Sequence, residues 1–111
     1  MALGDLASGE KIFKKCAACH SINKGGKNKI GPALYNVVGR AVGGLDNYKY
    51  SKTLASYGKE WTFEELNGFL QKPASYLKGT KMSYAGLRKE KDRASIIKYL
   101  NKKSDNPKLL P

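Results

Sequence analysis

Residues that commonly build reactive sites are scarce in this chain of 111 residues. It has two cysteines, two methionines and a single histidine. A closed structural zinc site needs four ligands, and the cysteines and histidine together supply only three. Residues 1–4 are too short for the apolar core of a signal peptide, and no apolar run is long enough to span a membrane. Alternating strand patterns are also scarce, and no internal repeat is visible.

Arginine and acidic residues are few, although the chain is strongly basic. It has 21 basic residues, of which only Arg40, Arg88 and Arg93 are arginines, against nine acidic ones, for a net charge of +12. Such a charge favours an acidic partner: nucleic acid, an anionic membrane or an acidic protein surface. Lysine is a hydrated point charge, whereas arginine has the planar fork suited to phosphates and base edges. The excess of lysine over arginine therefore favours weak docking to an acidic protein over nucleic-acid binding. The alternative is that the lysines only keep the surface soluble.

Helical periodicity predicts an all-α domain. The length fits one domain. Apolar spacing and capping residues predict helices in residues 7–22, 51–57, 61–73 (from the Thr62 and Glu65 capping box to Pro73) and 90–102. Long glycine-containing loops separate them, which is typical of a functional segment or of a non-protein group inside the fold.

Both cysteines and the histidine stand together in the stretch KKCAACH, at Cys16, Cys19 and His20. A disulfide between positions three apart on a helix would close no useful loop. A thioredoxin-like pair is expected after a strand, but here the pair ends a lysine-rich helix. Zinc lacks ligands, and the adjacent Cys19 and His20 are poorly placed to bind one metal ion. The fourth interpretation is C-x-x-C-H as the attachment motif of a c-type haem.

Covalent haem accounts for this spacing. Positions i and i+3 lie on one face of a helix, so both sulfurs can reach the two vinyl groups of one porphyrin. The next residue can then turn its imidazole toward the iron as an axial ligand. The sequence therefore predicts one haem c bound through Cys16 and Cys19, with His20 on the iron.

The second axial position decides whether such an iron carries electrons or binds a small ligand. Apart from Met1, which is the initiator in this interpretation, the only methionine is Met82, in the polar stretch KGTKMSYAG. Methionine usually fills apolar cores on helix faces, but a loop methionine can cover the far side of a flat cofactor. We therefore predict His20 and Met82 as the metal ligands. The alternative is a haem peroxidase or a small-ligand-binding haem protein, if Met82 is not a stable ligand.

These motifs resemble the class I cytochromes c over nearly the whole chain. In the order of that family, the chain has GEKIFKKCAACH, KIGPALYNVVGR, YKYS, EW, KGTKMSYAGL and a last helix ending in IIKYL. It is most similar to bacterial members close to the mitochondrial protein, including members with an N-terminal membrane anchor. The resemblance implies a fold of four or five short helices around one haem, with a haem domain at 1–103 and a mobile tail at 104–111.

The resemblance also implies roles for residues around the haem. Pro32 would offer its backbone carbonyl to the second nitrogen of His20, which fixes the ring and raises its donor strength. Burying the haem propionates requires hydrogen-bond donors, and the family places these four candidates nearby: Arg40, Tyr50, Trp61 and Thr80. If they have no such role, Arg40 is a surface arginine, and Tyr50 and Trp61 are core aromatics.

Other positions match the packing of the family or depart from it. Gly9, Phe13 and Tyr99 match the crossing of the first and last helices. Where mitochondrial members have a tyrosine whose hydroxyl reaches the methionine sulfur, this chain has Phe69. We expect that hydrogen bond to be missing, which affects the iron–sulfur bond and the reduction potential.

The implied function is that of a one-electron carrier of a respiratory chain, not an enzyme. The expected partners are a cytochrome bc complex as donor and a terminal cytochrome c oxidase as acceptor. An acidic partner surface would meet the lysines that flank the two ligand segments: Lys14, Lys15, Lys27, Lys29, Lys78 and Lys81. We expect a monomer in the bacterial periplasm, with or without a preceding membrane anchor, or in the mitochondrial intermembrane space.

Overall fold

The described part of the chain contains five helices, joined by loops. The computed structural model describes residues 4–45, 47–78, 82 and 84–109. Within these residues there is no β-strand, only an isolated antiparallel bridge between Ala41 and Glu60. The helices are α1 (Leu6–Cys16), α2 (Lys52–Ala55), α3 (Phe63–Gln71), α4 (Pro73–Tyr76) and α5 (Glu90–Lys102). The predicted all-α class is confirmed, and none of the described helices has the length and apolarity to cross a membrane.

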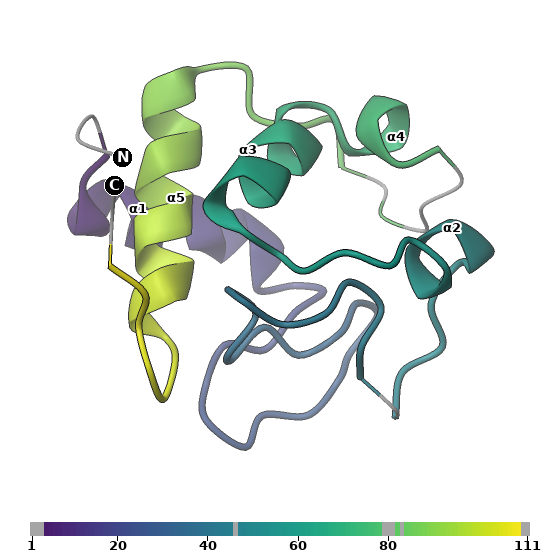
Figure 1. Ribbon diagram of the computed structural model, residues 1–111. Coiled ribbons are helices and arrows are strands. Elements are labelled where there is room, and N and C mark those ends of the chain that lie inside the picture. Colours follow the sequence, from purple (N-terminus) through teal and green to yellow (C-terminus); the bar gives the residue numbers. More distant parts are fainter. Residues whose placement is uncertain (1–3, 46, 79–81, 83, 110–111) are drawn as a thin grey trace.

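The crossing of α1 and α5 forms one end of the core. Figure 1 shows α1 passing behind α5. A Cβ atom on Gly9 would lie 2.2 Å from the Ser95 carbonyl oxygen, so only glycine allows this close approach. The rings of Phe13 and Tyr99 pack beside it with their centroids 5.5 Å apart. The predicted packing of the first and last helices is therefore confirmed.

Helix α3 lies beside α5 and begins where its cap predicts (Figure 1). The Thr62 hydroxyl accepts a hydrogen bond from the Glu65 amide, at 3.1 Å, as an N-cap should. The Glu65 carboxylate does not close the box, because it accepts hydrogen bonds from the hydroxyls of Tyr57 (2.9 Å) and Tyr76 (3.0 Å). This carboxylate therefore connects α3 with α4 and with the segment after α2.

The ends of three helices differ from the prediction. Helix α2 ends at Ala55 rather than at Tyr57. Helix α1 ends at Cys16 rather than near Ile22, and residues 17–19 form a turn in which the amides of Cys19 and His20 both donate to the Cys16 carbonyl. Pro73 does end α3, but it also begins α4, where its missing N–H is not needed.

The segment after α5 makes hydrogen bonds to the rest of the protein. Asp105 accepts from the side chains of Tyr35 and Asn36, at 3.2 and 3.0 Å. Asn101 and the backbone of Lys108 exchange two hydrogen bonds of 2.9 Å. The predicted domain boundary at residue 103 and the mobility of residues 104–111 remain predictions.

Candidate cofactor site

The two cysteines lie at the end of α1 and in the turn that follows it. Both are free thiols and half-buried, and Cys16 packs against the hydrophobic core. Burial, with a smaller contribution from Cys19, raises the pKa of the Cys16 thiol. Because the turn bonds back to the Cys16 carbonyl, Cys16, Cys19 and His20 stay close together although the helix has ended.

His20 is held in one orientation and one tautomer. Its Nδ1 lies 2.7 Å from the Pro32 carbonyl oxygen, and since a carbonyl can only accept, Nδ1 carries the proton. Burial lowers the pKa of the imidazole, against the opposing effect of the Pro32 carbonyl, and the charge of Arg40 lowers it slightly further. The lowered pKa favours the neutral ring with a lone pair on Nε2, which is the metal-binding form of histidine.

Gly31 sets the distance between the backbone and this ring. A Cβ atom on Gly31 would lie 2.3 Å from Cε1 of His20, far inside van der Waals contact. The Gly31 amide also donates to the Cys19 carbonyl, at 2.7 Å. No role of Gly31 was predicted from the sequence, although a glycine directly before Pro32 was a usable signal.

Arg40 has a buried donor that no described group accepts. Its Nη1 donates to the carbonyls of Ala33 and Tyr35, at 2.9 and 3.5 Å, whereas its Nε is buried without a partner. Burial lowers the pKa of this guanidinium, and Tyr50 partly offsets the effect. Leaving a buried donor unpaired is unfavourable, so this nitrogen suits an acidic group of a bound cofactor.

The predicted pocket residues come together in part. The Trp61 amide donates to the Arg40 carbonyl, at 2.8 Å, and the Trp61 side chain is buried against Phe69, with ring centroids 5.1 Å apart. The Tyr50 hydroxyl accepts from the Leu45 amide, at 3.3 Å. Thr80 and Lys81 lie outside the described residues.

Met82 is half-buried and packs against the same hydrophobic core as Cys16. Phe69 is part of that core and is buried. As a phenylalanine, it has no hydroxyl to offer a sulfur atom. This position therefore has no donor for the hydrogen bond that the family resemblance implies, and the effect on the iron–sulfur bond stays a prediction.

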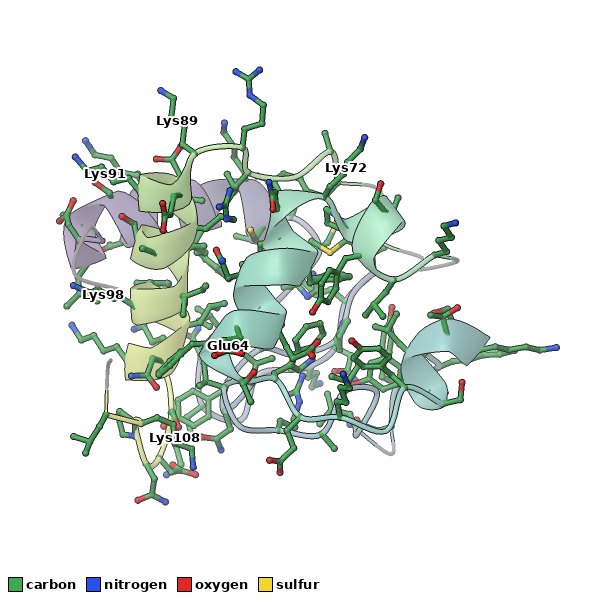
Figure 2. The ribbon with its side chains drawn as sticks, turned by 45° about the horizontal axis from the view of Figure 1, so that its top comes forward. Glu64, Lys72, Lys89, Lys91, Lys98 and Lys108 are labelled. Carbon is green, nitrogen blue, oxygen red and sulfur yellow. The ribbon has the colours of Figure 1, made fainter. Side chains whose placement is uncertain are left out.

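The predicted docking lysines that the structure describes are all exposed: Lys14, Lys15, Lys27, Lys29 and Lys78. The two ion pairs among the described residues involve Lys24 and Lys59 instead. Lys29 reaches the turn of the cysteine motif, where its Nζ donates to the Ala17 carbonyl at 3.0 Å. Within the described part of the chain, none of these docking lysines forms an ion pair. Lys91 and Lys98 on α5, and Lys89 directly before it, point outward beside this helix (Figure 2).

Replacing Arg40 by methionine tests its part in cofactor binding. If its Nε donates to an acidic group of the cofactor, Arg40→Met removes a charge-assisted hydrogen bond and lowers the free energy of unfolding by about 1.5–3 kcal/mol. Urea unfolding of the cofactor-loaded protein measures this loss. Arg88→Met, at an exposed arginine, is the control and should change stability by less than about 0.5 kcal/mol. Equal stability of the two variants would contradict this role.

Comparison with known proteins identifies the family. The family model for cytochrome c matches residues 6–104. A cytochrome c homolog of Bradyrhizobium diazoefficiens is 45% identical over 107 residues, which cover 96% of this chain and 58% of that protein. A cytochrome c of Gibberella zeae is 45% identical over 90% of this chain and 95% of its own length. A cytochrome c2 of Agrobacterium tumefaciens is 44% identical over 87% of this chain and 90% of its own length.

The chain spans less than two thirds of the length of several bacterial relatives, including a cytochrome c homolog of Rickettsia typhi, 49% identical, of which it covers 57%. The matching region nevertheless includes nearly every residue described above. Haem c is the cofactor of this family, and the residues present fit it: two thiols with the C-x-x-C-H spacing, a neutral imidazole and a buried, unpaired guanidinium nitrogen. Sequence motifs, helical fold and site chemistry agree with the match, and the chain belongs to the cytochrome c family.

Proposed function

We propose that this protein is a one-electron carrier with a haem c bound through Cys16 and Cys19 and with His20 and Met82 as the axial ligands. The observation that supports this most directly is the state of His20. Its Nδ1 proton is fixed on the Pro32 carbonyl at 2.7 Å, so Nε2 can bind iron without any change of tautomer or ring orientation. The half-buried Met82, packed against the same core as Cys16, supports the second ligand.

When bound, haem c supplies an iron that alternates between the ferric and ferrous states. The protein's part is to keep both ligands in place in both states, so that little has to move when an electron passes. A thioether ligand and an apolar surrounding favour the ferrous state and raise the potential. The buried Phe69 and Trp61 provide such a surrounding.

Four polar residues complete the proposed pocket. Arg40 has the buried Nε that needs an acceptor, and a haem propionate is a carboxylate of suitable charge. We assign Tyr50, Trp61 and Thr80 to the same group of donors. Pro32 acts through His20, because its carbonyl holds the imidazole and increases the electron density on Nε2.

We further propose that the protein is a monomer that receives electrons from a cytochrome bc complex and passes them to a cytochrome c oxidase. The compartment that suits these partners is the bacterial periplasm, with or without a membrane anchor, or the mitochondrial intermembrane space. Relatives named cytochrome c2 and cytochrome c support this assignment. Acidic partners would dock on the lysines that flank the two ligand segments: Lys14, Lys15, Lys27, Lys29, Lys78 and Lys81.

The salt dependence of electron transfer tests the docking surface. Replacing both Lys27 and Lys78 by glutamine should lower the second-order rate constant with the oxidase about tenfold at low ionic strength, because electrostatic steering is lost. The difference should shrink toward physiological salt, where the Debye length is about 8 Å. Stopped-flow spectrophotometry measures both rates.

The matched control removes two lysines from another exposed surface, with Lys91→Gln and Lys102→Gln on α5. It has the same net charge as the test variant. If both variants slowed the reaction equally, net charge rather than a docking surface would control the rate, and the proposed surface would be wrong.

A further inference from the structure

Arg93 is a buried cation whose hydrogen bonds to the described residues all go to neutral oxygens. It lies on α5 with 7% of its surface exposed. Its Nε donates to Oδ1 of Asn67, at 2.7 Å. Its Nη1 donates to the carbonyls of Leu87 and Arg88, at 2.9 and 2.7 Å. Burying a guanidinium with only neutral acceptors costs free energy. The parts of the fold that supply these acceptors indicate what the buried cation holds together.

These acceptors belong to two parts of the fold. Asn67 lies on α3, whereas Leu87 and Arg88 end the segment that follows Met82 and leads to α5. The side chain thus ties α3 and α5 to this segment. In Figure 1, the segment runs from the C-terminal end of α3 to the start of α5.

The same end of the segment is fixed by its backbone. The Leu87 amide donates to the Leu70 carbonyl of α3, at 2.7 Å, so both backbone groups of Leu87 are hydrogen-bonded. Gly86 has a φ of +111°, and a Cβ atom there would lie 2.2 Å from the Gln71 carbonyl oxygen. Glycine is therefore required for the chain to pass so close to α3.

We propose that Arg93 is a positioning residue for Met82: it fixes the end of the Met82 segment to α3 and so keeps the thioether on the iron. The proposal rests on the proposed function, in which Met82 is an axial ligand. Met82 is five residues before Leu87, so a shift of Leu87 reaches it through a short chain.

The guanidinium suits this role better than another cation would. It presents donors in a fixed fork that can reach acceptors on two sides at once, and it stays charged at all relevant pH values. A lysine ammonium is a single donor centre on a flexible stem and cannot bond Asn67 and both carbonyls with the same geometry. Arg93→Lys should therefore restore only part of the function lost in Arg93→Met.

Azide binding to the ferric protein tests the proposal. An external ligand binds only when Met82 has left the iron, so its apparent affinity rises with the population of the open form. We expect Arg93→Met to bind azide about tenfold more tightly than the wild type and to weaken the long-wavelength absorption band of methionine-ligated ferric haem. Arg93→Lys should lie between the two.

A second readout follows the segment itself. Hydrogen exchange at the Leu87 amide should speed up in Arg93→Met, while exchange at the Ala17 amide, bonded to Phe13 at the end of α1, stays as in the wild type. Asn101→Ala is the control: Asn101 is buried on α5, and its side chain exchanges two hydrogen bonds with the backbone of Lys108. It should lower stability in urea without changing azide affinity or Leu87 exchange.

Three results would overturn the proposal, and each has a different meaning. If Met82→Ala binds azide more tightly than the wild type but Arg93→Met and Arg93→Lys do not, Met82 is a ligand and Arg93 does not position it. If Met82→Ala and the wild type bind azide equally, Met82 is no ligand, and the proposed function fails together with this inference. An equal rise in azide affinity in Asn101→Ala would show a general loss of stability, which also contradicts a specific role of Arg93.

Discussion

Met82→Ala will lower the reduction potential by on the order of 100 mV or more, within the range of about 0.8 V over which axial ligands set haem potentials. The thioether stabilises the ferrous iron, and alanine has no atom to replace it. The iron will also become open to external ligands, so that peroxide turnover should rise above the wild-type level. Potentiometric titration followed by absorption measures the first effect, and a peroxidase assay measures the second.

The control for Met82→Ala is Ile12→Ala. Ile12 is another partly buried side chain packed against the same core, on α1 and outside the proposed ligand set. Its loss should lower stability while the potential stays near the wild-type value. If Met82→Ala kept the wild-type potential, or if Ile12→Ala lowered it equally, Met82 would be a core side chain rather than a ligand, and the peroxidase alternative would gain support.

Gly31→Ala should displace the imidazole of His20. The new Cβ would lie 2.3 Å from Cε1, so either the ring or the backbone at residue 31 must move. Movement of either would weaken the 2.7 Å hydrogen bond between His20 Nδ1 and the Pro32 carbonyl. This bond fixes the tautomer that leaves Nε2 unprotonated. We expect the free energy of unfolding to fall by about 1–3 kcal/mol from overpacking, with less haem incorporated and a changed ferric spectrum.

A second glycine provides the control. Gly25 has a φ of +75°, and no atom would lie within 4 Å of its Cβ. Gly25→Asn should be tolerated, since asparagine adopts this backbone conformation more readily than most residues. If Gly31→Ala had wild-type stability and a wild-type spectrum, the backbone would be able to move without lowering the free energy of unfolding. The role we give to Gly31 would then be wrong.

Local signals predicted most of the helical fold. Helix α5 has the bounds that its apolar spacing predicts, Glu90–Lys102, and α3 begins after its Thr62 cap. The family motifs add the crossing of α1 and α5. These features depend on residues close in sequence, or on motifs that stand in a fixed order, so the sequence alone is enough.

The errors arise where distant segments compete with local structure. Helix α1 was expected to continue past Cys16, but the Cys19 carbonyl accepts from the Gly31 amide, 12 residues away, and the chain turns to meet it. The Glu65 carboxylate was expected to cap its own helix but is taken by two tyrosines. The spacing of nearby residues does not indicate Gly31 as the partner of Cys19, nor the two tyrosines as the partners of Glu65.

The site was predictable in its chemistry but not in its supporting contacts. The C-x-x-C-H motif identifies Cys16, Cys19 and His20 directly, whereas the contact between Gly31 and the ring of His20 depends on how the loop folds back. Arg93 was overlooked, although it stands at helical spacing with the buried Ile96, Ile97 and Leu100. A cation within an apolar stripe was the available signal.

The ferric absorption spectrum of the haem-loaded wild type at neutral pH tests the central claim most directly. Ligation by His20 and Met82 predicts the weak long-wavelength band of methionine-bound ferric haem, lost in Met82→Ala and retained in Ile12→Ala. Absence of this band in the wild type would contradict the proposed ligand pair, and with it the account of the protein as a carrier whose iron stays closed to external ligands.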